Sequence, residues 1–529
     1  MADSVNEKVF RVTGTGPRQP AYEAASRGRR ARTWSSKNSG PNEVVNDLQT
    51  IRNRAHQLYR NSGFISNGVN KNSVNEVGTG IRLHPQMTNK SLRKRVLDLW
   101  ESFIEDCDSD GNTNFYGLQN LAVTSRELAG ECFIRRRIRK LSSAYRVPLQ
   151  IQLMESDYLP EQYFIYPDNG NEVLAGKELN RSGKVVAYHF YPYHPNDLQM
   201  KRLYISSTGY IRVPAQNIIH HYKQTRPGQL RGVSSIATPF VKSKTLEEYE
   251  DTELTRKANR AGFTGVIKRS SVDPEEEWRF DPFTGQPLDI GDDGSLEPVE
   301  LQSNTMLQLL PGEEATFYDS DKGDTAFDAF TRNQRLSMAA GLSGIPYELM
   351  TGDYKGMQDR LIKAVMLQYQ RQIETLQETI TIHQICKRVY SWFMDVIVAT
   401  GLIDIPDYMQ NRHEYLRALW IPHAWKYIHP EQEINAVIKA IDADLESVER
   451  YNRSRGVDME DILDSKKRYQ ESVKKRKLSG SESTNQDSPV TPTNPINPTN
   501  QQDVPDDEDD NDETEQETTE TEEDQEDGE

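Results

Sequence analysis

The sequence predicts an α+β protein, and three observations carry this prediction. Apolar and polar residues alternate within residues 130–222, which is typical of half-buried strands. Apolar residues recur three and four positions apart over residues 357–400, which predicts a long helix. Residues 501–529 hold 17 acidic residues and no Lys or Arg, which indicates a solvated tail rather than a packed element.

The charge distribution excludes several classes of protein. The 529 residues carry a net charge of −17, and the 17 acidic residues of 501–529 account for all of it. The remaining chain is formally neutral, so it lacks the basic surplus of a dedicated nucleic-acid binder. The most apolar stretch, Trp392–Thr400, is too short for a membrane span and contains Asp395.

Other features indicate a soluble cytosolic protein. The opening MADSVNEKVF has no apolar signal region. Three cysteines are too few for a disulfide scaffold, and their spacing gives no metal knuckle. Residues 1–42 are expected to form a flexible basic arm, with eight basic residues against three acidic ones. Such an arm is either a solvated terminus or a contact to DNA or an acidic partner, and both readings stay open.

Helices are expected over residues 43–61, 92–105 and 117–129. In the first, Leu48, Ile51, Ala55 and Leu58 form one apolar stripe, and the run NSGFISNGVN ends it. The other two helices flank a loop rich in Gly and Asn. Their expected core positions are Trp100, Phe103, Leu118, Leu121 and Leu128.

The β-rich section begins at residue 130 and is expected to be antiparallel. Alternation at Leu149, Ile151 and Leu153 predicts one strand, and Val185–Tyr191 predicts another, entered through the turn Asn180–Gly183. Ser207-Thr208-Gly209 predicts a hairpin turn. The basic run 134–140 would place three arginines on one strand face, where they meet a phosphate or carboxylate partner or protect a solvated edge. These arginines are Arg135, Arg137 and Arg139.

Residues 244–261 are expected to be a charged helix, 270–300 an exposed loop, and 326–342 a further helix that ends near Gly344. The long helix over 357–400 carries two apolar stripes that are out of phase, which predicts a kink or a change of packing partner near residue 382. Its seam is typical of packing between subunits, with a helix across a single core as the alternative. The first stripe is Ile362, Met366, Tyr369, Ile373, Leu376 and Ile380; the second is Ile385, Val389, Trp392 and Val396.

The C-terminal region predicts two more helices, over 431–449 and 458–477. The second ends in a basic cluster, which capping of the helix dipole explains. Residues 479–529 are expected to be a disordered acidic tail, because they hold no aromatic residue and few aliphatic ones.

Motifs for catalysis and cofactors are few. No Gly-Lys-Ser or Gly-Lys-Thr occurs, so a phosphate-binding loop of the P-loop kind is absent from the sequence. Asp106, Asp108 and Asp110 match the opening of a calcium loop, but Gly117 stands at the twelfth position, where a bidentate Glu is needed. These aspartates are weak metal candidates, and an acidic loop with Asx turns is favoured. We expect no cofactor and no catalytic residue.

Several segments in the same order resemble the lambda-type portal proteins of tailed bacteriophages. The resemblance covers roughly residues 43–465. It rests on the following segments: IRNRAHQLYRNSGFISNGVNKNSVNEVGTGIRLHPQ, Trp100 to Glu131, LQIQLMESDYL, GKVVAYHFYPYHPND, RPGQLRGVSSIA, AAGLSGIPYELMTGDY, and Trp420 to Glu431. After Gly352-Asp353 the run up to Arg360 departs from the family's usual small polar residues.

The resemblance implies a non-enzymatic function. Portal proteins form a ring, typically a dodecamer, at one capsid vertex, through which double-stranded DNA passes during packaging and ejection. Implied partners are the terminase large subunit, the major capsid or scaffold protein, and a head-tail connector protein, with no membrane involved. The implied location is the virion, and the host cytoplasm during assembly. The alternative is a metal-dependent DNA-processing enzyme of the packaging machinery.

The resemblance also implies a portal fold with a β-rich wing, a long helical stem, a small clip and a helical crown. The wing would be residues 43–325, the stem 326–400 with the clip near 346–359, and the channel-facing and crown region 401–478. Candidate DNA-channel residues are Arg332, Arg335, Lys363 and Arg371, for which solvated faces or ion pairs are the alternative. Candidate docking residues in the clip are Tyr347, Glu348, Asp353, Tyr354 and Lys355.

Overall fold

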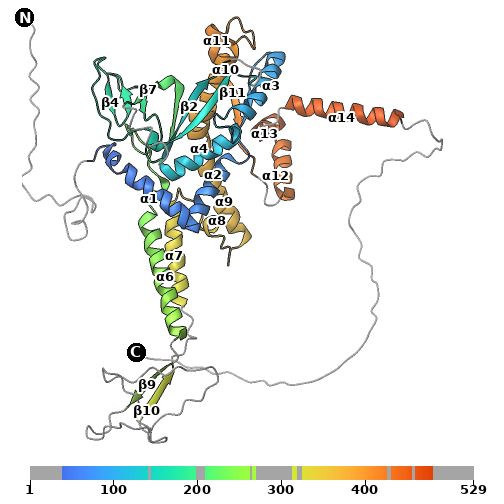
Figure 1. The fold of residues 1–529 in the computed structure, drawn as a ribbon. Helices are drawn as coiled ribbons and strands as arrows, with labels where there is room; N and C mark the ends of the chain where they lie inside the picture. The colour runs from blue at the N-terminus through green and yellow to red at the C-terminus, as the bar shows by residue number, and fades with distance from the viewer. Residues whose placement is uncertain are drawn as a thin grey trace, which may run out of the picture. The chain divides into compact units, whose positions relative to one another are not determined.

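The structure is a computed structural model that describes residues 39–140, 145–197, 209–262, 265–269, 313–317, 325–425, 430–455 and 459–479 (Figure 1). Four sequence predictions fall wholly or mostly outside these ranges: the N-terminal arm, the Ser207-Thr208 turn, the 270–300 loop and the acidic tail. The chain divides near Met459 into two units, which are described separately.

The chain enters the fold through a short 3-10 turn, Glu43–Asn46, and two helices, α1 (Leu48–Asn61) and α2 (Gly63–Val77). The predicted break is therefore confined to the extended residue Ser62, and most of NSGFISNGVN is helical. Our expectation was wrong here because Ile65 and Val69 of this run are fully buried. Burial against the rest of the protein outweighs the poor helix propensity of Gly and Asn.

Helices α3 (Lys90–Asp106) and α4 (Phe115–Ala129) confirm the next two predictions. The Asn89 side chain caps α3, and Gly130 ends α4 with φ of +91°. Four of the five expected core residues are buried: Trp100, Phe103, Leu118 and Leu128. The fifth, Leu121, is 49 % exposed, so its assignment to the core was wrong.

All strands in the described residues pair antiparallel, which confirms the predicted β-rich middle. One sheet has the order β3-β2-β8 and comprises β2 (Glu131–Ile138), β3 (Leu149–Glu155) and β8 (Ile218–Tyr222). A second has the order β4-β5-β6-β7 and comprises β4 (Glu172–Leu174), β5 (Lys177–Leu179), β6 (Val185–Phe190) and β7 (Ile211–Pro214). In addition to Glu43–Asn46, the described residues form 3-10 turns at Ser156–Tyr158, Ala215–Asn217 and Ser235–Ala237.

Two further strand pairs join segments that are far apart in the sequence. Strand β1 (Arg82–Pro85) pairs with β11 (Ala418–Ile421), which ties the start of the fold to residues beyond the long helix. Strand β9 (Gly265–Arg269) pairs with β10 (Glu313–Phe317), with Arg269 opposite Glu313.

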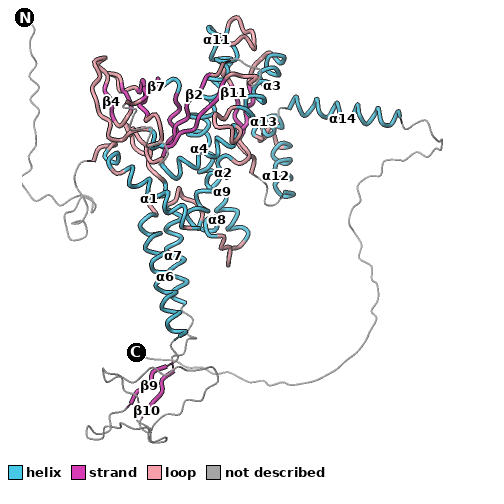
Figure 2. Tube along the Cα trace, in the orientation of Figure 1, coloured by secondary structure: helices cyan, strands magenta, loops and turns pink. Residues whose placement is uncertain are grey.

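The helices that flank β9 and β10 in the chain, α6 (Phe240–Gly262) and α7 (Thr325–Gly341), pack side by side (Figure 2). The rings of Tyr249 on α6 and Phe330 on α7 lie 5.1 Å apart. Both helices were predicted, but the sequence did not indicate that they pair. Residues 360–400 were grouped with α7 as stem helices, and within this stretch the buried residues run from Tyr369 to Ile397.

The long helix extends without interruption through α9 (Asp359–Leu376), a π-helical segment (Gln377–Cys386) and α10 (Lys387–Ala399). The π-helical segment spans residue 382, where the phase of the apolar stripes changes. Wider π turns shift the phase of a helix, so the first stripe packs in one core cluster and the second in another, which confirms the predicted change of packing partner. Packing of both stripes between subunits was wrong, because most of their residues are buried within one chain.

Two large clusters form the core, one on each part of this helix. The Trp100 cluster joins α3, α4 and α10, and its rings include Phe103, Tyr390, Phe393 and Trp420, all within 6.2 Å of the Trp100 ring. The Ile65 cluster joins α2 to α9 through Ile65, Val69, Met350, Tyr369 and Ile373. The long helix is therefore the central support of the larger unit.

The C-terminal part consists of helices. These are α11 (Tyr408–Tyr415), α12 (Pro430–Asp442), α13 (Val448–Ser454) and α14 (Met459–Ser479). The predicted 431–449 helix divides into α12 and the start of α13, and the predicted 458–477 helix is confirmed as α14. Within the described ranges, no helix combines the length and apolar character that a membrane span requires.

Candidate functional site

The candidate channel arginines on α7 both have partners within the chain. Arg335 forms an ion pair with Glu250 on α6 at 2.7 Å, and its guanidinium lies 4.7 Å from the Phe64 ring centroid. Arg332 is exposed, and its guanidinium lies 5.6 Å from the Tyr347 ring centroid. The ion-pair alternative therefore describes Arg335, while Arg332 keeps its charge at the surface.

The candidate channel residues on α9 lie about two turns apart. Arg371 is exposed, and Lys363 is half-buried and has a partner within the chain. The opposite face of the helix is anchored in the Ile65 cluster through Tyr369, whose hydroxyl donates to Asn72 Oδ1 at 2.8 Å. A basic surface on α9 is thus held by a rigid support.

The candidate docking residues divide into a buried anchor and an exposed loop. Helix α8 (Tyr347–Thr351) packs on α2, where the Asn67 amide donates to the Met350 carbonyl at 2.7 Å. Tyr347 is only 7 % exposed, and its hydroxyl donates to Asp353 Oδ2 at 3.1 Å. Tyr347 was a candidate docking residue, and in the structure its buried side chain holds the loop through Asp353. Glu348 is half-buried on the same short helix.

The exposed loop follows at residues 352–358, between α8 and α9. Tyr354 and Lys355 project to solvent, while Asp353 organises the turn. The Lys355 backbone N–H and the Tyr347 hydroxyl both donate to the Asp353 carboxylate, which lowers its pKa. Gly352 and Gly356 adopt φ of +75° and +76°, a conformation that favours glycine.

The acidic loop 106–113 forms an Asx turn around Asp108. Asp108 accepts N–H bonds from Asp110, Asn112 and Thr113, at 3.1, 2.9 and 3.1 Å. Backbone N–H bonds of this kind are typical of an Asx turn, the alternative favoured for this loop. Asp106 and Asp110 are exposed beside it.

Among the described residues, one His and carboxylate cluster brings ligand atoms together. Atoms of Glu155, Asp157 and His194 lie within 4.8 Å of one another. Two of these side chains already have partners within the chain. Asp157 forms an ion pair with Arg52 at 3.2 Å, and His194 Nδ1 accepts a hydrogen bond from the Asn196 N–H at 3.3 Å. The cluster is chemically capable of holding a divalent cation, but its present partners satisfy it without one.

Glutamine side chains accept hydrogen bonds from two arginines of the basic run 134–140. Arg137 donates to Gln152 Oε1 at 2.7 Å, and Arg139 donates to Gln150 Oε1 at 2.6 Å. Both glutamines lie on the neighbouring strand β3. These arginines therefore connect the end of β2 to the neighbouring strand β3 within the sheet.

A buried ionic network, which sequence analysis missed, joins the two sheets. Glu131 on β2 accepts from Arg231 at 2.6 Å, from the Gly232 backbone N–H at 2.8 Å, and lies 2.7 Å from His220 Nε2 on β8. Arg231 and Glu131 are both fully buried. The neighbouring Lys177 on β5 donates to the Leu230 carbonyl and lies 5.1 Å from the Tyr222 ring.

Burial governs protonation in this network. It lowers the pKa of His220 to about 3 and that of Lys177 to about 7. Although burial opposes it, the combined effect of Arg231, His220 and Gly232 lowers the pKa of Glu131. Only the separation of these residues along the chain concealed them, since sequence spacing does not reveal pairs that are about 90 to 100 positions apart.

A second buried network supports the π-helical segment. Arg126 on α4 forms a bidentate bond to Glu76 on α2, at 2.8 and 2.6 Å, and also pairs with Glu127 at 2.8 Å. Thr381 of the π-helix donates its hydroxyl to Glu76, and the Gln377 amide donates to the Glu76 carbonyl at 2.7 Å. The irregular turn of the long helix is therefore fixed by polar partners.

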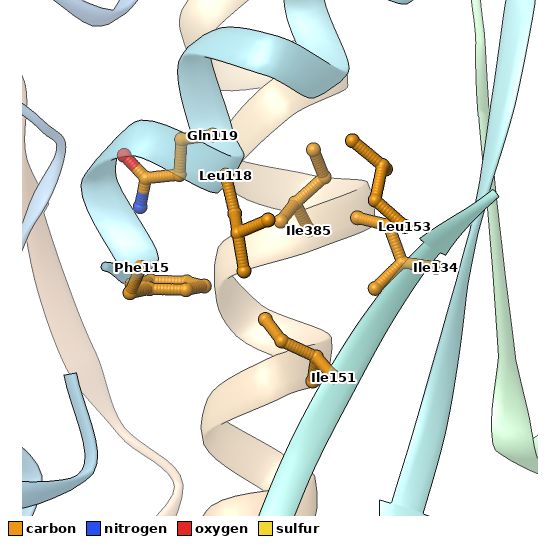
Figure 3. Close-up of a pocket in the computed structure, with 7 residues that line it drawn as sticks. All are labelled: Phe115, Leu118, Gln119, Ile134, Ile151, Leu153 and Ile385. Carbon is orange, nitrogen blue, oxygen red and sulfur yellow. The ribbon is translucent and has the colours of Figure 1, made fainter. Parts of the chain in front are cut away.

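The core contains a small apolar cavity of about 10 Å³ between α4, the β2 and β3 strands and the π-helix (Figure 3). Its lining is Phe115, Leu118, Gln119, Ile134, Ile151, Leu153 and Ile385. The space is at the lower limit for one water molecule and is almost entirely apolar, so it is a packing gap rather than a ligand site.

Comparison with known proteins now decides the family. The family described as "Phage portal protein, lambda family" matches residues 27–377, well over half of the chain. The chain belongs to the lambda family of phage portal proteins. This portal chain is 24 % identical over 469 residues to the probable portal protein of Halomonas phage phiHAP-1, covering 84 % of this chain and 87 % of that protein. It is 20 % identical over 445 residues to Portal protein B of Escherichia phage lambda, covering 78 % and 81 %.

The comparison with solved structures matches chains from gene transfer agent (GTA) particles. The portal chain matches a chain in the neck of the native GTA particle with a TM-score of 0.45 and 12 % identity, covering 78 % of this chain and 93 % of that one. It matches a chain in the virion of the native GTA particle with a TM-score of 0.39 and 13 % identity, covering 80 % and 96 %.

Proposed function

We propose that this portal protein acts as a closed ring, a dodecamer, at one vertex of the capsid. In this function the ring conducts double-stranded DNA during packaging and ejection and has no enzymatic activity. Family membership supports the portal role. The single observation that best supports ring assembly is apolar surface on helices that have no partner for it within the described part of one chain.

The helix pair α6 and α7 carries part of this surface. Val241 and Leu254 on α6 are 70 % and 66 % exposed, and Phe330 and Leu336 on α7 are also exposed. Apolar residues on two packed helices provide a rod with outward-facing contacts. In a closed ring each rod lies between two neighbours, so both sides of the rod are covered. We propose that α6 and α7, rather than α7 with α9, form the stem.

Helices α12 and α13 carry the other part of this exposed apolar surface. Ile434 and Ile438 are separated by one helical turn on α12, and both are about half exposed. Leu445 and Val448 continue the apolar surface toward α13 and are exposed as well. A stripe of this kind needs another helix to cover it. We propose that the crown helices of neighbouring subunits provide this cover.

For the channel we propose Arg332, Lys363 and Arg371 as weak contacts to DNA phosphates. Arg335 is left out of this set because it forms an ion pair with Glu250 on α6. Few phosphate contacts suit a conduit, because each one strengthens binding and opposes sliding. For docking we propose the exposed loop, through Tyr354 and Lys355. The partners are those of the portal role: the terminase large subunit, the head-tail connector protein and the major capsid or scaffold protein. The location is the virion vertex, and the host cytoplasm during assembly.

The first experiment measures assembly. The purified full chain is examined by native mass measurement and negative-stain imaging, together with Leu254→Asp and the matched control Leu121→Asp. Leu121 is similarly exposed but lies on α4, outside the proposed interface. We expect closed rings for the wild-type protein and the control, and monomers with unchanged helicity for Leu254→Asp. Rings that persist in Leu254→Asp would refute the α6 interface.

A cleavage assay separates the portal function from the enzyme alternative. The ring is incubated with supercoiled plasmid DNA and Mg²⁺. We expect the plasmid to stay intact. Nicking or linearisation that co-purifies with the ring and requires Mg²⁺ would favour a DNA-processing enzyme.

A further inference from the structure

We propose that the acidic segment 501–529 docks on the basic half of helix α14 of the same chain. The second half of α14, residues 466–477, contains seven basic residues and a single acidic one, Glu471. Lys466, Lys467, Lys474 and Lys475 are all exposed. Within the described ranges, none of these four lysines forms an ion pair. This inference does not depend on the portal function.

The helix dipole explains only part of this basic cluster. Favourable interaction of cations with the C-terminal dipole falls off within the last turn, which includes Arg476 and Lys477. Lys466, Lys467 and Arg468 lie about three turns before the end of the helix at Ser479. Clustering of like charge there costs free energy, unless an anion compensates it. The helix dipole therefore does not account for the basic residues in the middle of α14, and an anionic partner would offset their mutual repulsion.

The charge of the chain identifies that partner. Residues 501–529 hold 17 acidic residues and no basic one, whereas 1–500 is formally neutral. Residues 466–477 carry a net charge of +6, from seven basic residues and one acidic residue. The acidic segment therefore offers more negative charge than the helix needs. Outside it, the basic and acidic residues of the chain balance.

The connecting segment is long enough for this contact. Residues 480–500 separate the helix from the acidic segment, and 21 residues can span up to about 70 Å when extended. Helix α14, at 21 residues, is about 32 Å long. The acidic segment can therefore reach any turn of its own helix. A short tether also gives an effective concentration in the millimolar range, so weak ion pairs suffice.

The experiment uses zero-length carbodiimide cross-linking of the full-chain, nuclease-treated protein, followed by mass spectrometry. Four other exposed lysines provide the internal control: Lys94, Lys140, Lys184 and Lys223. We expect links from the α14 lysines to residues 503–529 at least fivefold more often than from the control lysines. At 1 M salt the Debye length is about 3 Å, so these links should disappear. Equal linking of both lysine sets overturns the proposal.

Two further measurements address alternatives. The protein is assembled from a mixture of ¹⁴N and ¹⁵N chains. Links within one isotope indicate docking in the same chain, whereas links between the two isotopes would show docking on a second chain and would overturn the same-chain part of the proposal. Acetylation of lysines by a soluble reagent then compares the full chain with chain 1–500. We expect several-fold faster acetylation of Lys466 and Lys467 in chain 1–500, and an unchanged rate at Lys94 and Lys184. If only added duplex DNA protects Lys466 and Lys467, the occupant is DNA and the proposal is wrong.

Discussion

Arg335 on α7 forms an ion pair with Glu250 on α6, with 2.7 Å between Nη2 and Oε1. Each side chain is about one quarter exposed, and the Arg335 guanidinium also faces the Phe64 ring on α2. One side chain therefore connects three helices. Arg335 was selected as a candidate DNA contact because of its charge. The ion pair indicates that it is better described as part of the α6 and α7 pair.

A charge swap tests this interpretation. Arg335→Glu places two carboxylates together, and we expect a loss of about 1 kcal/mol in the free energy of unfolding, measured with urea. Combining it with Glu250→Arg should recover most of that loss and should restore packaged DNA in assembled particles. If stability recovers while packaging does not, Arg335 contacts DNA directly.

Removing Arg231, the cation that pairs with Glu131 in the buried network, should lower the free energy of unfolding far more than the charge swap does. Arg231→Met leaves the Glu131 carboxylate buried with its main charge partner gone, which typically costs about 3–5 kcal/mol. The matched control is Lys387→Met, since Lys387 also pairs with a carboxylate, Glu378, but both side chains are at least half exposed. We expect a loss of about 1 kcal/mol or less for the control. Similar unfolding midpoints for both variants would contradict the role assigned to Glu131.

Acid should weaken the fold through His220. Its pKa is about 3 in the folded chain and about 6.5 when unfolded, so below pH 6.5 only the unfolded chain takes up this proton. The stabilisation is complete above pH 6.5 and is lost as the pH falls toward 3. His220 faces Glu131, Lys177 and Arg231, while the adjacent His221 is also buried with a lowered pKa and contributes similarly.

His220→Gln isolates this contribution, because the amide can still donate to Glu131. Between pH 6.5 and 5 we expect the pH dependence of the unfolding free energy to flatten by about one proton, or about 1.4 kcal/mol per pH unit. Urea unfolding at four pH values measures the slope. The same slope in the variant and the wild-type protein would exclude His220 as the group that titrates.

The π-helical segment sets the rotation of α10 relative to α9. Deleting the exposed residue Thr379 would rotate the following helix by about 100° and turn Val389 and Phe393 away from the Trp100 cluster. We expect the deletion variant to aggregate or to lose several kcal/mol in thermal unfolding. Thr379→Ala, which keeps the register, should stay near the wild-type stability. A stable deletion variant would mean that the phase of the two halves is not fixed.

Local signals in the sequence predicted most individual elements. The stripes of α3 and α4, the alternation in β3, and the phase change near residue 382 each depend on neighbours within about ten residues, and the structure confirms them. The α2 helix was missed because its Gly and Asn residues favour turns, while only distant partners bury Ile65 and Val69. Pairing of α6 with α7 was missed for the same reason, since residues 263–324 separate the two helices.

Candidate site residues were harder to predict, because charge alone does not reveal a partner. Arg335 and Tyr347 were chosen for their chemistry, and both turned out to have structural partners within the chain. The fully buried Arg231 gave no sequence signal at all, since a basic residue followed by Gly is typical of an exposed turn. By contrast, Tyr354 and Lys355, which the portal resemblance made docking candidates, are exposed.

The pairing of Arg269 with Glu313 has a practical consequence for engineering. Because β9 and β10 are antiparallel, the chain departs at residue 269 and returns at residue 313 directly opposite. Any folded protein whose own ends lie close together should fit between these two points, in place of 270–312, without moving α6 or α7 apart. A fluorescent protein inserted there should leave the urea midpoint unchanged, and would label each subunit for single-particle tracking of particle assembly.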